Sequence, residues 1–298
     1  MRHLENAFKF TFKNFLLTLP LLISLAIPAL VQGVGNVGVM ANSNKIFSNL
    51  QRMIEDLQYG GGNFNYFDMF AGIDMRAAYA SSAIAGVLSL IFMIIVRPAT
   101  YGLINLNYET GNAKLNDFSR SMSKYIGRYV LYGLLHIAIA IGITIVFVIL
   151  MVIAGIVAAT ISVPFGVLLI ILFILATIVG SVALYTYMNL WFPAICVEDS
   201  DIMQGLKNSF RFVKGSFWPI FGITLLVTVC GSIAGSILGG IIGLIPIVGN
   251  IVAPIITGLA QFILMVYYFE IYREKTGRYT IPEPPQQFNG GYPNGGIQ

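Results

Sequence analysis

Two long uncharged runs constrain the fold of this chain more than any other feature. Residues 129–197 contain no Asp, Glu, Lys or Arg, and neither do residues 215–269. A water-soluble domain cannot leave runs of that length uncharged, because much of any globular surface faces water. Each run is long enough for two bilayer crossings of about 20 residues each, joined by a turn. The sequence therefore predicts an all-α polytopic integral membrane protein.

The composition agrees with this interpretation. Only 10% of the 298 residues are charged, against roughly 25% in ordinary soluble domains. We expect one membrane domain over residues 1–280, followed by a disordered cytoplasmic tail at 281–298 that is rich in Pro, Gly, Gln and Asn. Cys196 and Cys230 both lie in apolar stretches, and we interpret them as buried packing thiols.

Six apolar segments predict six transmembrane helices. The first is interpreted as a retained span rather than a signal peptide, and the second is expected to stop at Arg97-Pro98. The longest outer loop, 41–76, contains a weakly helical piece at 44–57; we favour an ordered loop resting on the membrane interface over a small binding cap. Tight turns are expected at 160–166 and 246–250. The expected spans are 15–39, 77–96, 129–158, 167–192, 217–244 and 252–272.

The distribution of basic residues predicts the orientation. With six spans both termini lie on the same side, and that side collects fourteen of the 17 Lys and Arg. The other side holds only Lys45, Arg52 and Arg76. Because cytoplasmic loops carry the excess of Lys and Arg, both termini are expected to be cytoplasmic. We expect the protein in the cell (plasma) membrane.

Three similar segments precede the first, third and fifth spans. They read FKFTFKNF at 8–15, MSKYIGRY at 122–129 and FRFVKGSF at 210–217. Each extends backwards into an amphipathic stretch, at 4–12, 115–126 and 202–213. We predict a threefold internal repeat of an interfacial helix, an outward span, a hairpin and an inward span; the alternative is that every cytoplasmic span entrance is basic and aromatic. Candidate lipid contacts on these helices are Lys9, Lys13, Lys124, Arg128, Arg211 and Lys214.

Small residues recur every four positions through the fifth span. Because no hydrophobic force drives helices together in lipid, such residues let backbones approach and pack. We expect another helix along this face, either in the same chain or in a second copy. The residues are Gly231, Gly235, Gly239 and Gly243.

His136 is the one imidazole within a predicted span. An ionisable group inside the membrane is a functional hypothesis by default. No Asp or Glu lies in a span core to partner it, and no second ligand lies at metal-binding spacing. We therefore interpret His136 as a neutral imidazole bonded to a hydroxyl or carbonyl near the interface.

The carboxylates near span ends are given structural roles. Asp201 precedes an amphipathic stretch and is expected to cap its N-terminus. Glu270 lies one turn from Arg273, and we expect an interfacial ion pair there.

The stretch VEDSDIMQGLKNSFRFVKGSFWPIFGITLL, residues 197–226, carries a family signature. Glu198 follows the inward span, Gly205-Leu206-Lys207-Asn208-Ser209 comes next, and Lys214-Gly215 and Phe217-Trp218 enter the following span. This stretch resembles the glycerophosphoryl diester phosphodiesterase membrane-domain family and the YciC-like membrane proteins. The resemblance implies an all-helical membrane domain. Some relatives carry a soluble phosphodiesterase barrel after it; this sequence shows none, so we do not expect that activity.

No catalytic motif is present in the sequence, and we expect no enzyme, cofactor, metal or nucleic-acid partner. The favoured function is a non-enzymatic membrane protein that binds membrane lipids, a protein partner or a second copy of itself at the cytoplasmic face. A small transporter or flippase-like protein for an apolar or amphipathic cargo is the first alternative. A membrane immunity or stress protein is the second, and an intramembrane enzyme is least favoured.

Overall fold

The computed structural model describes residues 2–59, 65–242 and 248–278, so Gly243, residues 246–247 of the expected turn and the predicted tail at 281–298 lie outside the described residues. Within those ranges every regular element is a helix, which confirms the all-α prediction. The 3₁₀ helices are η1 (Phe15–Thr18), η2 (Tyr66–Phe70) and η3 (Leu115–Asp117). The α-helices are α1 (Arg2–Lys13), α2 (Leu19–Ala41), α3 (Ser43–Gln58), α4 (Arg76–Thr110), α5 (Phe118–Thr160), α6 (Val163–Met188), α7 (Trp191–Glu198), α8 (Ile202–Lys214), α9 (Phe217–Ile242) and α10 (Val248–Lys275).

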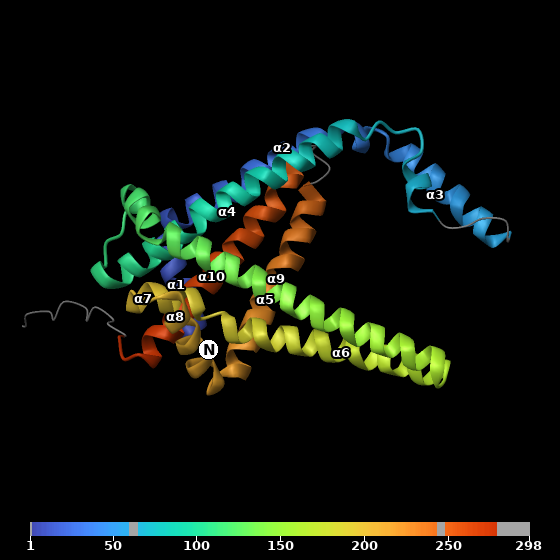
Figure 1. Ribbon diagram of the computed structural model, residues 1–298. Helices are drawn as coiled ribbons and strands as arrows, with labels where there is room; N and C mark the ends of the chain where they lie inside the picture. The colour runs from blue at the N-terminus through green and yellow to red at the C-terminus, as the bar shows by residue number, and fades with distance from the viewer. Residues whose placement is uncertain (1, 60–64, 243–247, 279–298) are drawn as a thin grey trace, which may run out of the picture.

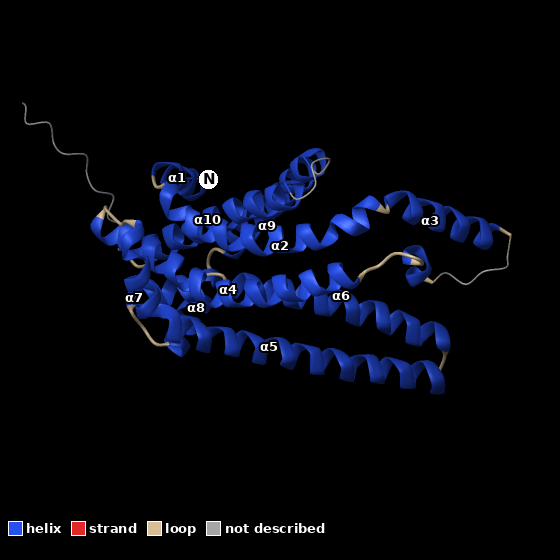
Figure 2. Ribbon diagram, turned by 90° about the horizontal axis from the view of Figure 1, so that it is seen from above, coloured by secondary structure: helices blue, strands red, loops and turns tan. Residues whose placement is uncertain are grey.

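Six segments are long and apolar enough to cross a membrane, as predicted. They form three pairs, which we call the arms: α2 with α4, α5 with α6, and α9 with α10. The arms extend to the same side of a shared base (Figures 1 and 2). The base consists of α1, α7, α8 and the adjoining ends of α4 (from residue 97), α5 (to residue 128) and α10 (from residue 262).

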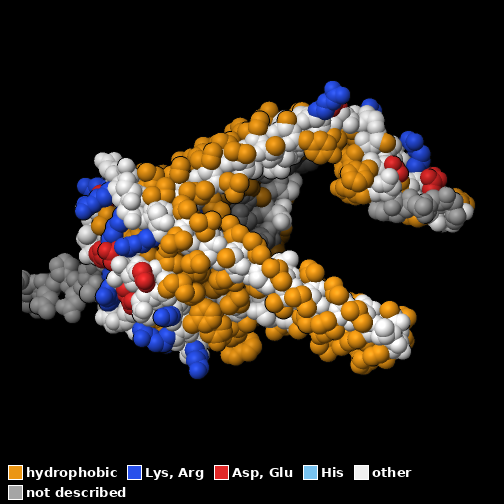
Figure 3. Space-filling model, viewed as in Figure 1, with side chains coloured by type: hydrophobic (Ala, Val, Ile, Leu, Met, Phe, Trp, Pro, Cys, Tyr) orange, Lys and Arg blue, Asp and Glu red, His pale blue; other side chains and the backbone are white. Residues whose placement is uncertain are grey.

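The packed core lies in the base. Its largest fully buried side chains include Trp191, Phe192, Phe269 and Tyr272. The arm of α5 and α6 is different, because the hydrophobic stretch of α6 contains no buried residue, whereas 39% of that of α2 is buried. Figure 3 shows apolar side chains along the arms and Lys and Arg gathered over the base, with a smaller charged group at the far end of α2 and α3. Apolar arms of this length need lipid around them.

The arms also explain a wrong prediction. Cys196 is buried, but Cys230 is exposed on α9. An apolar sequence context indicates burial inside the protein only for a soluble chain. In a membrane arm it equally indicates a side chain that faces lipid.

The predicted repeat is supported by how its units pack. Each entry segment packs on the inward helix of the preceding unit, and the order closes on itself: the start of α5 on α4, α8 on α7, and α1 on α10. We call these three contacts the junctions. When the three sequence segments are aligned, buried residues fall at two matching positions. Ala7, Ser121 and Ser209 share the first, and Thr11, Tyr125 and Val213 share the second.

Two boundary predictions around the second unit are wrong. The helix of the second span does not stop at Arg97-Pro98, because α4 continues through Pro98 to Thr110. The residues that follow are buried in the base, where leaving the helix would strand backbone N–H and C=O groups without partners. The stretch 115–126 is not a separate interfacial helix either, since α5 runs unbroken from Phe118 into the membrane arm. The other two amphipathic stretches are separate helices, α1 and α8.

The turns at the tips of two arms differ from the prediction. The turn expected at 160–166 occupies only Ile161 and Ser162, and α6 begins at Val163. Ser162 caps α6 by accepting a hydrogen bond from the Phe165 amide, and Pro164 lies in the first turn, where its missing N–H costs nothing. Residues 248–250, expected in the next turn, already belong to α10.

The segment after α2 contains a helix where one was predicted. The piece expected at 44–57 is α3, which exposes apolar side chains such as Phe47 and Ile54 and has no buried residue. The Asn49 amide donates to the Met69 and Ala71 carbonyls, so the two sides of this segment are joined. Its role, interfacial loop or binding cap, stays a prediction.

Candidate functional site

Two of the three junctions are closed around a carboxylate. At the junction of α1 and α10, Glu270 is only 4% exposed. It accepts hydrogen bonds from the Asn6 amide at 3.3 Å and the Tyr108 hydroxyl at 2.5 Å. The predicted ion pair with Arg273 is therefore wrong. Arg273 instead donates to Asn105 at 3.0 Å and lies over the Tyr108 ring.

The junction of α7 and α8 repeats this arrangement. Glu198 accepts hydrogen bonds from the Asn208 amide and the Tyr272 hydroxyl, both at 2.6 Å. Asn6 and Asn208 occupy the same place in the repeat, two residues before the matching FKF and FRF triplets. Each carboxylate thus has one amide and one phenol as donors, which satisfies it and holds three helices together: α1, α4 and α10 at Glu270, and α7, α8 and α10 at Glu198. Such a group is a structural clamp rather than a free base.

The third junction, between α4 and the start of α5, is open. It contains a cavity of about 140 Å³. The Asn105 amide donates to Glu109 at 2.8 Å and to the Cys196 carbonyl at 3.1 Å, and Tyr125 donates to the same carbonyl. The cavity is lined by Gly102, Asn105, Leu106, Glu109, Arg120, Ser121, Lys124 and Tyr125.

Sequence reasoning missed most of this cavity. Of its lining it named only Lys124 as a candidate. A signal for Arg120 was available, since Arg120, Lys124 and Arg128 recur every four residues and share one helix face. No local signal marked Glu109, because its helix was expected to end before it.

The predicted lipid-contact residues all lie in the base. Lys9, Lys13, Lys124, Arg211 and Lys214 are exposed, whereas Arg128 is half-buried. Lys9 pairs with Glu5 at 2.6 Å within α1, and the Arg211 guanidinium lies over the Phe212 ring. Across the described part of the chain, Lys13, Arg211 and Lys214 form no ion pair.

Asp199 gathers two of these cations. It forms an ion pair with Arg128, and Lys124 approaches it at 3.7 Å. The hydrogen bond from Arg128 lowers the pKa of the Asp199 carboxyl below its usual range. Asp199 ends α7 with φ +52°, a left-handed conformation that Asp tolerates better than most residues. Nearby, the Asp201 side chain accepts from the Gln204 amide at 2.8 Å, which confirms the predicted cap of α8.

His136 lies on the arm side of the base. Its Nδ1 is 3.3 Å from the Tyr132 carbonyl, and its ring stacks on Trp191 at 5.1 Å between centroids. A carbonyl partner agrees with the prediction for this imidazole. In the residues that the structure describes, no group of three or more His, Cys, Asp or Glu side chains could hold a metal ion.

The glycine face of α9 packs within the same chain. A Cβ placed at Gly231 would lie 2.6 Å from the Ala260 Cβ, one at Gly235 3.2 Å from the Ala253 carbonyl oxygen, and one at Gly239 3.0 Å from the Ala253 Cβ. All these neighbours belong to α10. This confirms the first of the two predicted partners for these glycines.

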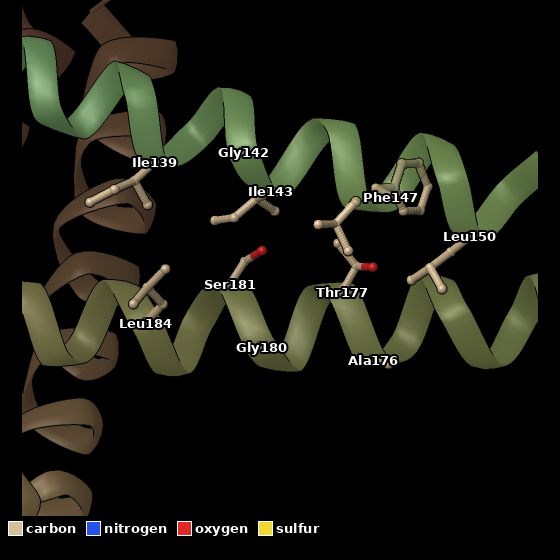
Figure 4. Close-up of a pocket in the computed structure, with 11 residues that line it drawn as sticks. Ile139, Gly142, Ile143, Phe147, Leu150, Ala176, Thr177, Gly180, Ser181 and Leu184 are labelled. Atoms are coloured by element: carbon tan, nitrogen blue, oxygen red, sulfur yellow. The ribbon is translucent and has the colours of Figure 1, made fainter.

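An apolar groove runs between α5 and α6 in the arm. It encloses about 480 Å³ and is lined by residues such as Ile143, Phe147 and Gly180. Figure 4 shows Thr177 and Ser181 pointing from α6 toward α5, so two hydroxyls lie in an otherwise apolar groove.

Comparison with known proteins gives one family match. A family model described as Domain of unknown function (DUF7847) matches residues 21–268, which include all three arms. No curated protein and no solved structure matches the chain. The match carries no information about activity, and the resemblance to the phosphodiesterase membrane-domain family stays a prediction.

Proposed function

We propose that this chain, which belongs to the DUF7847 family, is a non-enzymatic multi-pass membrane protein whose base binds anionic lipid at the cytoplasmic face of the plasma membrane. One observation carries the proposal: exposed Lys and Arg of the entry helices lie beside exposed aromatic side chains at the end of the molecule where the arms begin (Figure 3). This pairing is typical of helices that lie in the headgroup layer.

α1 shows the arrangement most clearly. It buries Ala7 and Thr11 against the base, while Phe12 remains 64% exposed next to Lys13. An exposed Phe is unfavourable in water and favourable at the boundary of headgroups and acyl chains. A neighbouring Lys extends its ammonium toward the phosphates.

α8 repeats the arrangement. Phe210 is exposed on one side, although its ring also stacks on Tyr187, and Arg211 and Lys214 follow it. Each basic residue near an anionic leaflet contributes about 1 kcal/mol of attraction. The unpaired cations of the base therefore supply several kcal/mol, enough to select anionic lipids as neighbours.

A matched pair of triple variants tests the proposal. The first replaces Lys13, Arg211 and Lys214 with Gln, and the control replaces Lys45, Arg52 and Arg76 with Gln on the opposite side. Both remove three positive charges. The proteins are purified from mixed bilayers, and the co-purified lipids are measured by mass spectrometry. We expect the first variant alone to lose anionic lipid, and an unchanged lipid profile would refute the proposal.

The groove between α5 and α6 favours a second candidate, transport of an amphipathic cargo. Its two hydroxyls provide polar contacts along an apolar path. Gly142→Leu and Gly180→Leu would fill the groove, and Gly155→Leu on the same arm is the control, because Gly155 does not line the groove. Flux of a fluorescent lipid in reconstituted vesicles should fall only in the first two variants. Equal flux in all three would remove this candidate.

A further inference from the structure

The three junctions of the base are equivalent in sequence but not in chemistry. Two carry an Asn on the entry helix, Asn6 or Asn208, which donates to a carboxylate on the partner helix. The corresponding position of the third entry segment, two residues before Met122, is Arg120. A change from a neutral amide to a guanidinium at one of three repeated positions marks the third junction as different in role.

Arg120 also differs in its surroundings. Asn6 and Asn208 lie against their partner helices, whereas Arg120 is exposed at the mouth of the cavity between α4 and α5. Within the described ranges Arg120 forms no ion pair. Gly102 lets α4 and α5 approach closely beside the cavity; a Cβ there would lie 2.7 Å from the Ser121 Cβ.

The charges around the cavity are unbalanced toward positive. Arg120 and Lys124 line it together with one carboxylate, Glu109, which already accepts a hydrogen bond from Asn105. Just outside the cavity, Arg128 forms an ion pair with Asp199, and the Lys124 ammonium lies 3.7 Å from the same carboxylate. The side chain of Lys124 is half exposed, so its ammonium can turn into the cavity. The hydroxyl of Ser121 adds a neutral donor, whereas that of Tyr125 already donates to the Cys196 carbonyl.

The depth of the cavity suits a lipid headgroup. Tyr129 begins the uncharged run of α5, and Lys124 lies five residues before it, about 7.5 Å along the helix axis. The headgroup layer extends roughly 5–7 Å beyond the hydrocarbon core on each side. The Lys124 backbone therefore lies at the outer edge of the headgroup layer, from which its long side chain reaches phosphate level, and Arg120 reaches the same level from one turn farther out.

The size of the cavity limits what it holds. Its volume of about 140 Å³ corresponds to the share of roughly four to five liquid waters at ~30 Å³ each. That is room for a phosphate and a small substituent but not for acyl chains, which would have to lie outside against the apolar arms.

We infer that this cavity binds a phosphate group, with Arg120 and Lys124 as its charged donors and a lipid headgroup as its source. The inference rests on the proposed function, because it names the phosphate site through which the base holds an anionic lipid. Glu109 at the rim disfavours a bare anion and accepts hydrogen bonds from a hydroxyl or ammonium on the phosphate substituent.

A pair of double variants tests the site. Arg120→Gln/Lys124→Gln removes the two donors, and Lys45→Gln/Arg52→Gln removes two exposed cations on α3, away from the base. Native mass spectrometry measures retention of phosphatidylglycerol by the whole protein in detergent. Because a hydrogen bond to a charged group contributes about 1.5–3 kcal/mol, we expect the first variant to weaken binding at least tenfold. The control should change it less than about twofold.

Two single variants and a competition experiment extend this test. Arg120→Gln alone, which leaves the Lys124 contact with Asp199 intact, should still weaken binding, and Glu109→Gln should strengthen it. Competition by water-soluble glycerol phosphate would support a phosphate site and assign its source to a soluble ester, whereas no competition assigns it to lipid. Equal losses in the two double variants would overturn the cavity assignment alone. Failure of the unmodified protein to retain anionic lipid would overturn the proposed function as well.

Discussion

The contact between α9 and α10 gives a sharp prediction for a single methyl group. In Gly231→Ala the new Cβ would lie 2.6 Å from the Ala260 Cβ. Carbon atoms in contact settle at about 3.5–4.0 Å. An alanine Cβ is fixed to its backbone and cannot rotate away, so the two helices must separate by about 1 Å.

The magnitude follows from two opposing effects. An alanine in place of glycine inside a helix stabilises by about 1 kcal/mol. Forced overpacking in a close contact costs about 1–3 kcal/mol. Gly222, on the same helix, is the matched control, because a Cβ there meets no atom within 4 Å. We expect Gly222→Ala to raise the free energy of unfolding and Gly231→Ala to lie about 1–3 kcal/mol below it.

Reversible unfolding in mixed micelles, titrated with a denaturing detergent, measures both variants under identical conditions. The comparison removes effects of helix propensity, since the chemical change is the same in both. If Gly231→Ala stabilises the protein as much as Gly222→Ala does, the close approach of α9 and α10 at this residue is refuted.

Three further predictions address the base and the arms. Asn208→Ala should lower the free energy of unfolding by about 2 kcal/mol, because Glu198 loses a hydrogen bond to a charged group; the exposed Lys207→Ala is the control, expected within about 0.5 kcal/mol. The Asp199 pKa is lowered in the folded state. Its ion pair therefore stabilises the fold above the usual carboxyl pKa near 4, and this stabilisation is lost as the pH falls below that value. Thermal melting should show a smaller acid-induced loss of stability in Asp199→Asn than in the unmodified protein. A maleimide added to the protein in bilayers should leave both cysteines unmodified before denaturation, because Cys196 is buried in the base and the lipid around Cys230 disfavours its thiolate. Peptide mass spectrometry that finds Cys196 labelled in the folded protein would contradict its burial.

The arms could be predicted from the sequence because their signal is local. An uncharged run longer than a bilayer crossing has one physical solution, and six spans follow from counting. The glycine face could be read for the same reason, since a period of four residues defines one side of a helix. Helix ends were predicted less well. Local rules interpret Pro98 and Pro164 as helix breakers. However, α4 continues through Pro98 into a buried segment, and Pro164 lies in the first turn of α6.

The base could not be predicted, because its contacts join distant parts of the chain. Asn6 and Glu270 are separated by 264 residues, and no local pattern pairs them. Proximity along the helix suggested Arg273 as the partner of Glu270, but in a packed core each side chain bonds to the groups that other helices bring next to it. Arg273 turns to Asn105 and Tyr108, and Glu270 turns to Asn6.

The third junction shows how one substitution in a repeat changes a packing site into a binding site. Asn6 and Asn208 can be buried because an amide that donates to a carboxylate leaves little charge uncompensated. A guanidinium in the same place carries a full charge, and burying it without a close counter-ion costs several kcal/mol. Glu109, the carboxylate that lines the cavity, is held by Asn105, and Asp199 is occupied by Arg128. Arg120 therefore remains at the surface, the junction stays open beneath it, and an anion from outside the chain is the counter-charge that the cavity lacks.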